Sequence, residues 1–202
     1  AKGVDWAIRL TQVLGVPLKI AGQNAEGGLR EVGFWPVPPH VELVGHINAE
    51  QKKQLMARAK AVICMSTFAE PFCGVHVEAM MSGTPIITSD WGAFAEFNVH
   101  GVTGFRCRTL EQMIEAGRRI HEIDPEACRK WAMDNFSTDR VADMYEAFFK
   151  GQMIPTMTKK IAIWSENRWA LGRIGRAIQK YLPNVDFYDW LSLEDNTQLW
   201  IQ

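Results

Sequence analysis

Two glutamates, Glu70 and Glu78, flank a glycine, Gly74, in a segment that leaves an expected strand and enters an expected helix. The free backbone amides and the dipole at the start of a helix attract anions. Gly74 has no side chain, so a diphosphate could approach the main chain closely there. Carboxylates beside a bound anion repel it, and they are expected to contact neutral sugar hydroxyls instead. A plainer interpretation stays open, in which Glu78 complements the helix N-terminus and Glu70 is a solvated loop charge.

Strands and helices alternate along the chain, and this alternation places the two glutamates at the end of a buried strand. We expect strands at 17–21, 41–44, 61–65, 86–88 and 105–107, and helices at about 6–14, 48–60, 74–82, 109–123, from 125 and from 137. The Gly- and Pro-rich stretch 24–39 and the stretch between 88 and 101 are expected to be loops. Short, continuously apolar strands are typical of a parallel sheet covered on both faces. The sequence therefore predicts an α/β fold with a doubly wound, Rossmann-like parallel sheet, whose ligands bind at the carboxyl ends of the strands.

The pattern restarts after Gly151, which predicts a boundary between two domains. We expect a first domain over 1–151, a linker over 152–159, and the incomplete start of a second Rossmann-like domain over 160–202. This tail would contain a strand at 160–164, a helix at 170–181 and a further element at 185–188. The chain also begins directly with a helical pattern, so we expect that it comes from a longer protein.

Composition excludes several classes of partner. The net charge is -1, so no global positive field favours nucleic acid. No apolar run reaches about 18 residues, so we expect neither a membrane-spanning helix nor a signal peptide. The four cysteines lack the spacing of a zinc site, and reduced thiols suggest a cytoplasmic protein. We expect no cofactor.

A longer ordered motif surrounds the two glutamates. The segment contains, in order, Glu70, Phe72, Gly74, Glu78, Ala79, Met80, Gly83, Pro85, Ile86 and Ile87. It resembles the E-x7-E signature of retaining glycosyltransferases of the GT-B fold, family 4 type, although Gly74 lies one place late and Cys73 stands where the family usually has glycine. Further matches to the family pattern are Lys2-Gly3-Val4-Asp5 upstream and Gly92, Glu96, Gly101, Thr103, Gly104 and Phe105 downstream. The resemblance identifies residues 2 to about 150 as the C-terminal, donor-binding half of a GT-B fold.

The resemblance implies a role for each matching position. Glu78 would hold the ribose hydroxyls of a nucleotide, and Glu70 would contact the hydroxyls of the donor sugar. Lys2 would neutralise the diphosphate as it leaves. Backbone amides would meet the donor at Phe72, Cys73 and Gly74, and the base would lie near Gly45, His46 and Ile47. For His76, inside the motif, a structural role is the preferred interpretation.

The implied reaction moves a sugar from a nucleotide diphosphate sugar to an acceptor hydroxyl with retention, without a metal. The resemblance also implies that a missing N-terminal Rossmann domain recognises the acceptor, whose identity as glycan, lipid or small molecule is unknown. We therefore expect this chain alone to be inactive. Two alternatives stay open: a nucleotide-sugar epimerase of the same fold, and a non-catalytic module that only binds nucleotide sugars.

Overall fold

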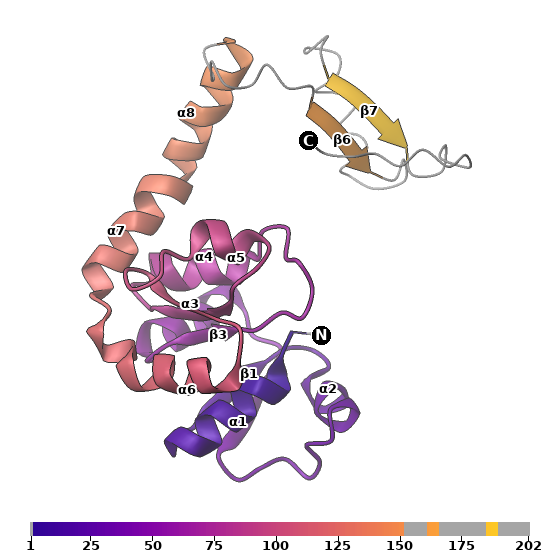
Figure 1. The fold of residues 1–202 in the computed structure, drawn as a ribbon, viewed down its shortest axis with the longest axis vertical. Coiled ribbons are helices and arrows are strands. Elements are labelled where there is room, and N and C mark those ends of the chain that lie inside the picture. The colour runs from indigo at the N-terminus through magenta and orange to yellow at the C-terminus, as the bar shows by residue number, and fades with distance from the viewer. Residues whose placement is uncertain (1, 152–160, 166–184, 190–202) are drawn as a thin grey trace. The chain divides into compact units, whose positions relative to one another are not determined.

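The computed structural model describes residues 2–151, 161–165 and 185–189 (Figure 1). The chain divides into two compact units. The first ends at Arg140, and the second begins at Val141. The helices of the described ranges are α1 Val4–Leu14, α2 Ala25–Glu31, α3 Ala49–Arg58, α4 Gly74–Met81, α5 Ala93–Phe97, α6 Leu110–Arg119, a 3-10 turn at Ile120–Glu122, α7 Pro125–Phe136 and α8 Thr138–Phe149. The strands are β1 Leu18–Ala21, β2 Val41–Gly45, β3 Val62–Cys64, β4 Ile86–Ser89, β5 Gly104–Cys107, β6 Ile161–Ser165 and β7 Val185–Asp189.

The strands of the first unit are all parallel, which confirms the predicted α/β class. β1 pairs with β2, and β3, β4 and β5 form a second ladder with β4 in the centre. All four residues of β4 are buried, as expected for a central strand covered on both faces. Because the strands run the same way, the loops that leave β3 and β4 emerge at the same edge of this sheet.

Local sequence signals set the starts of α3 and α7. Asn48 and Gln51 form a reciprocal capping box at the start of α3, as the sequence predicts. Asp124 caps α7 through the Glu126 amide, and Pro125 occupies its first turn. These caps satisfy backbone amides that would otherwise lack partners, so the helix starts are fixed independently of packing.

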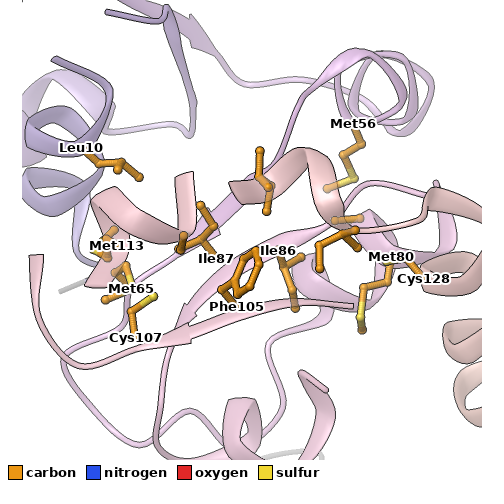
Figure 2. Close-up of a cluster of buried hydrophobic side chains, with 14 of the residues drawn as sticks. Leu10, Met56, Met65, Met80, Ile86, Ile87, Phe105, Cys107, Met113 and Cys128 are labelled. Carbon is orange, nitrogen blue, oxygen red and sulfur yellow. The ribbon is translucent and has the colours of Figure 1, made fainter. Parts of the chain in front are cut away.

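One hydrophobic core joins the three-stranded sheet to its helices. Ile86, Ile87 and Phe105 lie in the middle of this cluster (Figure 2). Leu10 of α1 and Met113 of α6 lie toward one end of it, and Met80 of α4 and Cys128 of α7 toward the other in Figure 2. A smaller cluster of Ile8, Leu29 and Val41 supports the β1–β2 pair.

Two short helices lie where loops are predicted from sequence, so those predictions are wrong. α2 falls within 24–39, where Gly27 and Gly28 conceal the helical pattern. Burial of Leu29 against Ile8 and Val41 stabilises α2 despite its glycines. The five-residue helix α5 falls between 88 and 101 and is held by the fully buried Phe94. In both cases tertiary burial outweighs local propensity.

The second unit includes two described strands, β6 and β7, which pair in parallel from Ile161–Val185 to Ser165–Asp189. Both lie where strands are predicted. The predicted linker at 152–159 and the predicted helix at 170–181 lie outside the described residues, and the predicted domain boundaries stay a prediction. Within the described ranges, every helix is too short or too polar to cross a bilayer.

Candidate functional site

Glu70 lies in the loop between β3 and α4, and its carboxylate is almost completely buried. The same carboxylate oxygen, Oε1, accepts hydrogen bonds from the Lys2 ammonium and from the Ser66 hydroxyl. Burial raises the pKa of the Glu70 carboxyl, but the bonds from Lys2 and Ser66 outweigh it, so the net pKa lies below its ordinary value. Glu70 is therefore an ionised, oriented acceptor at neutral pH.

Lys2 reaches Glu70 across 68 residues of sequence, which brings together the two residues predicted to be catalytic. Its side chain is 66% exposed while that of Glu70 is 5% exposed. The ammonium also lies 4.8 Å from the centre of the Phe68 ring, within cation–π range. The lysine thus keeps one face toward solvent while the buried carboxylate fixes its position.

Gly3 explains how Lys2 comes so close to the end of β3. Its φ is +67°, and a Cβ at this position would lie 2.0 Å from the carbonyl oxygen of Met65. Only glycine lets the main chain pass this near, because any side chain would collide with backbone. The close contact of Gly3 with the Met65 backbone therefore holds the neighbouring Lys2 side chain near Glu70.

The N-terminus of α4 is open. Its N-cap residue, Cys73, has a left-handed backbone with φ +61° and makes no side-chain capping bond, and the first turn has no acidic residue. A Cβ on Gly74 would meet no atom within 4 Å. Phe72, just before, is 45% exposed. This stretch offers unshielded amides and space, which an anion requires.

Cys73 also faces a second thiol, Cys64 at the end of β3. A hydrogen bond from Cys64 lowers the pKa of Cys73 to about 5; burial opposes this shift, and the adjacent His76 ring reinforces it. The same bond raises the pKa of Cys64. Cys73 is therefore the more acidic thiol of this pair.

His76 lies in the first turn of α4, and its side chain belongs to the buried interior. It is fully buried. Its ring stacks on Phe97 at a centroid distance of 6.0 Å and meets Phe94 edge-on at 5.5 Å. This packing agrees with the structural role predicted for His76, which stays a prediction.

Glu78 projects from α4 toward α3 and pairs with a residue that sequence reasoning missed. Lys52 Nζ lies 2.6 Å from Glu78 Oε1, and the two side chains are 36% and 44% exposed. The other oxygen, Oε2, is buried and has no hydrogen-bond partner among the described residues. Nothing in the sequence links a lysine and a glutamate that lie 26 positions apart on different helices.

Gly45, His46 and Ile47 form the turn that joins β2 to α3. Gly45 has a φ of +68°, His46 is exposed, and Ile47 is half-buried. Ile47 lines a shallow hollow of about 300 Å³. The other lining residues are Lys19, Glu42, Val44, Gln51, Gln54, Leu55 and Arg58. Of the three predicted base-binding residues, Ile47 alone borders this hollow.

The structure thus gives each glutamate of the motif its own lysine. Glu70 pairs with Lys2 at the start of α1, and Glu78 pairs with Lys52 on α3. Ser66, the second partner of Glu70, was also missed, although its place directly after a strand could have indicated it. Among the described residues, no cluster of His, Cys, Asp or Glu side chains could hold a metal ion.

The family model for glycosyl transferases group 1 matches residues 2–133. Glycogen synthase from Mycobacterium tuberculosis is 35% identical over 140 residues, which cover 65% of this chain and 33% of that protein. Spore coat protein SA of Bacillus subtilis is 28% identical over 113 residues, 52% of this chain and 30% of that protein. The chain spans about a third of the length of these relatives.

Solved glycosyltransferases share the fold. AviGT4, a glycosyltransferase involved in avilamycin A biosynthesis, superposes with a TM-score of 0.62 at 24% identity, over 74% of this chain and 49% of that one. Anabaena Alr3699/HepE, solved in complex with UDP-glucose, gives 0.57 at 22% identity, over 72% and 45%. These similarities confirm the predicted Rossmann-like half of a GT-B fold.

Proposed function

Because the chain belongs to the glycosyl transferases group 1 family, we propose that it binds the nucleotide diphosphate sugar from which a glycosyltransferase takes its sugar. The observation that carries this proposal is the ion pair of Lys2 with Glu70, because Glu70 lies in the loop that leads to the open N-terminus of α4. A cation and uncapped amides attract a diphosphate, and a buried, ionised carboxylate accepts bonds from sugar hydroxyls. Uridine diphosphate sugars are the first donors to test, because Alr3699/HepE was solved with UDP-glucose.

The proposed reaction breaks the bond between the anomeric carbon and the diphosphate and forms one to an acceptor hydroxyl, with retention. Lys2 would stabilise the charge that develops on the leaving diphosphate, in place of a metal ion. Its exposed ammonium can turn from Glu70 toward a bound diphosphate without breaking any core contact. Glu70 would then be released to hold the donor sugar.

The remaining predicted residues complete the donor site in this proposal. The amides of Phe72, Cys73 and Gly74 would contact the donor, and Glu78 would accept bonds from the ribose. The turn at Gly45, His46 and Ile47 would border the base, because it leads directly into α3, whose Lys52 contacts Glu78. A further Rossmann domain would supply the acceptor site, in line with the share of AviGT4 that this chain spans.

Calorimetric titration of the full chain tests the donor-binding proposal. Uridine, guanosine and adenosine diphosphates are compared, followed by the matching nucleotide sugars. Glu78→Gln should weaken binding of the preferred diphosphate by about 1–3 kcal/mol, the cost of losing hydrogen bonds to a charge. Glu115→Gln, an exposed glutamate on α6, serves as the control and should leave affinity unchanged. Failure of the wild-type chain to bind any of the nucleotides would refute the proposal.

A further inference from the structure

Glu78 offers a single accessible oxygen. Oε2 is buried without a hydrogen-bond partner among the described residues, whereas Oε1 meets Lys52 at 2.6 Å. A carboxylate with one oxygen enclosed by protein has little freedom to rotate. Any ligand hydroxyl that donates to Glu78 must therefore approach Oε1, and there it also meets the ammonium of Lys52.

Lys52 is held in this place by its helix. The capping box of Asn48 and Gln51 fixes the start of α3, and the Lys52 amide donates to the Asn48 carbonyl oxygen at 2.9 Å. An ammonium has three N–H donors, and the pair with Glu78 occupies one. Among the described residues no other partner takes the remaining two, and the side chain is 36% exposed. Lys52 therefore retains donors for a ligand.

The pair presents an acceptor and a donor side by side. Neighbouring ribose hydroxyl oxygens lie about 2.8 Å apart, roughly hydrogen-bond distance, close to the 2.6 Å between Lys52 Nζ and Glu78 Oε1. One hydroxyl can donate to Oε1 while the oxygen of the other accepts from Nζ. A 2′-deoxyribose lacks one of these hydroxyls. One member of the Lys52–Glu78 pair would then have no hydrogen-bond partner on the ligand.

Building on the proposed function, we propose that Lys52 is a specificity-determining residue which, together with Glu78, recognises the ribose diol of the nucleotide and selects it against 2′-deoxyribose. Glu78 accepts from the 3′-hydroxyl, and Lys52 donates to the oxygen of the 2′-hydroxyl. The contrasting interpretation is an ordinary surface ion pair, which contributes little and has no influence on ligand choice.

The test measures the affinity of the full chain for uridine, guanosine and adenosine diphosphates and for their 2′-deoxy forms by calorimetry. Wild type should prefer the ribose form of its best nucleotide by roughly tenfold or more, the scale of one charged hydrogen bond. Lys52→Met should lose most of its affinity for the ribose form, keep its affinity for the deoxy form, and so lose the preference. Lys52→Arg, which keeps the charge and donors, should restore part of it.

Lys53→Met is the matched control, because Lys53 is the next residue on the same helix and is exposed. It should retain the wild-type preference. If Lys52→Met unfolds the chain, Lys52→Gln replaces it, and urea unfolding of each variant checks that the fold is intact. A Lys52 variant that keeps the full ribose preference while Glu78→Gln loses it would overturn the role of Lys52 and leave the proposed function standing. Absence of any nucleotide binding by wild type would overturn both.

Discussion

Gly92 lies directly against the main chain of Glu70. The Ala93 amide donates to the Glu70 carbonyl oxygen at 2.8 Å, and a Cβ on Gly92 would come within 2.6 Å of the Glu70 amide nitrogen. Gly92 also adopts φ +59° and ψ −149°, a region that is essentially restricted to glycine. The loop after β4 therefore supports the loop that carries Glu70, and neither can shift alone.

Gly92→Ala should displace Glu70 and weaken binding of the nucleotide sugar more than binding of the bare diphosphate. It should also lower the free energy of unfolding by about 1–3 kcal/mol, because the new methyl group strains the backbone and collides with it. Gly101→Ala is the control, since Gly101 also has a positive φ, +81°, but a Cβ there would meet nothing within 4 Å. Equal effects of the two substitutions in calorimetry would show that Gly92 does not position Glu70.

The buried carboxylate of Glu70, paired with Lys2, should make stability sensitive to acid. The pKa of this carboxyl is lowered in the fold, so the unfolded chain takes up its proton first as pH falls. The stabilisation is thus complete above the ordinary pKa of glutamate, about 4.3, and is lost as pH falls through the lower pKa of the folded state. Urea unfolding from neutral to acidic pH should show this loss in wild type and a shallower one in Glu70→Gln. Parallel curves for both proteins would contradict it.

Cys73 should be the most reactive thiol of the four. The hydrogen bond from Cys64 lowers the pKa of Cys73, whereas burial raises the pKa values of Cys107 and Cys128 to about 11 and about 12, so Cys73 has the larger thiolate fraction at neutral pH. Brief treatment with iodoacetamide near neutral pH, followed by mass spectrometry, should therefore label Cys73 first. Cys64→Ala removes the hydrogen bond that lowers the pKa and should slow labelling in mildly acidic buffer. Labelling of Cys128 at the same rate as Cys73 would argue against this order.

Asn98 should be critical for stability. It is buried, donates to Thr88 Oγ1 at 2.9 Å and to the Phe105 carbonyl oxygen at 3.2 Å, and accepts from Thr103 Oγ1 at 3.1 Å. Asn98→Ala removes these three buried hydrogen bonds and should lower the free energy of unfolding by about 1–3 kcal/mol.

Asn135→Ala is the comparison variant for Asn98. Its amide donates to the Trp131 carbonyl oxygen at 2.8 Å on an exposed helix face, where water can replace the bond. A change below about 0.5 kcal/mol is expected there. Similar losses in urea unfolding for both variants would contradict the importance of the buried network.

The class of the fold and the starts of α3 and α7 follow from local sequence signals. Apolar strands such as β4 are continuous, and the caps at Asn48 and Asp124 act within a few residues of chain. These signals are local, so a reader of the sequence can recognise them. The ordered motif from Lys2 to Phe105 likewise indicates a glycosyltransferase, and the match to the glycosyl transferases group 1 family confirms this.

The pairing of side chains in the candidate site depends on how distant elements pack. Lys2 pairs with Glu70 and Lys52 with Glu78, although 68 and 26 residues separate the partners. The short helices α2 and α5 were hidden for the same reason, since Leu29 and Phe94 stabilise them by burial against distant segments. Local chemistry limits what each segment of backbone can form, but the distance between two charged side chains depends on how whole elements pack, and no local pattern encodes that distance.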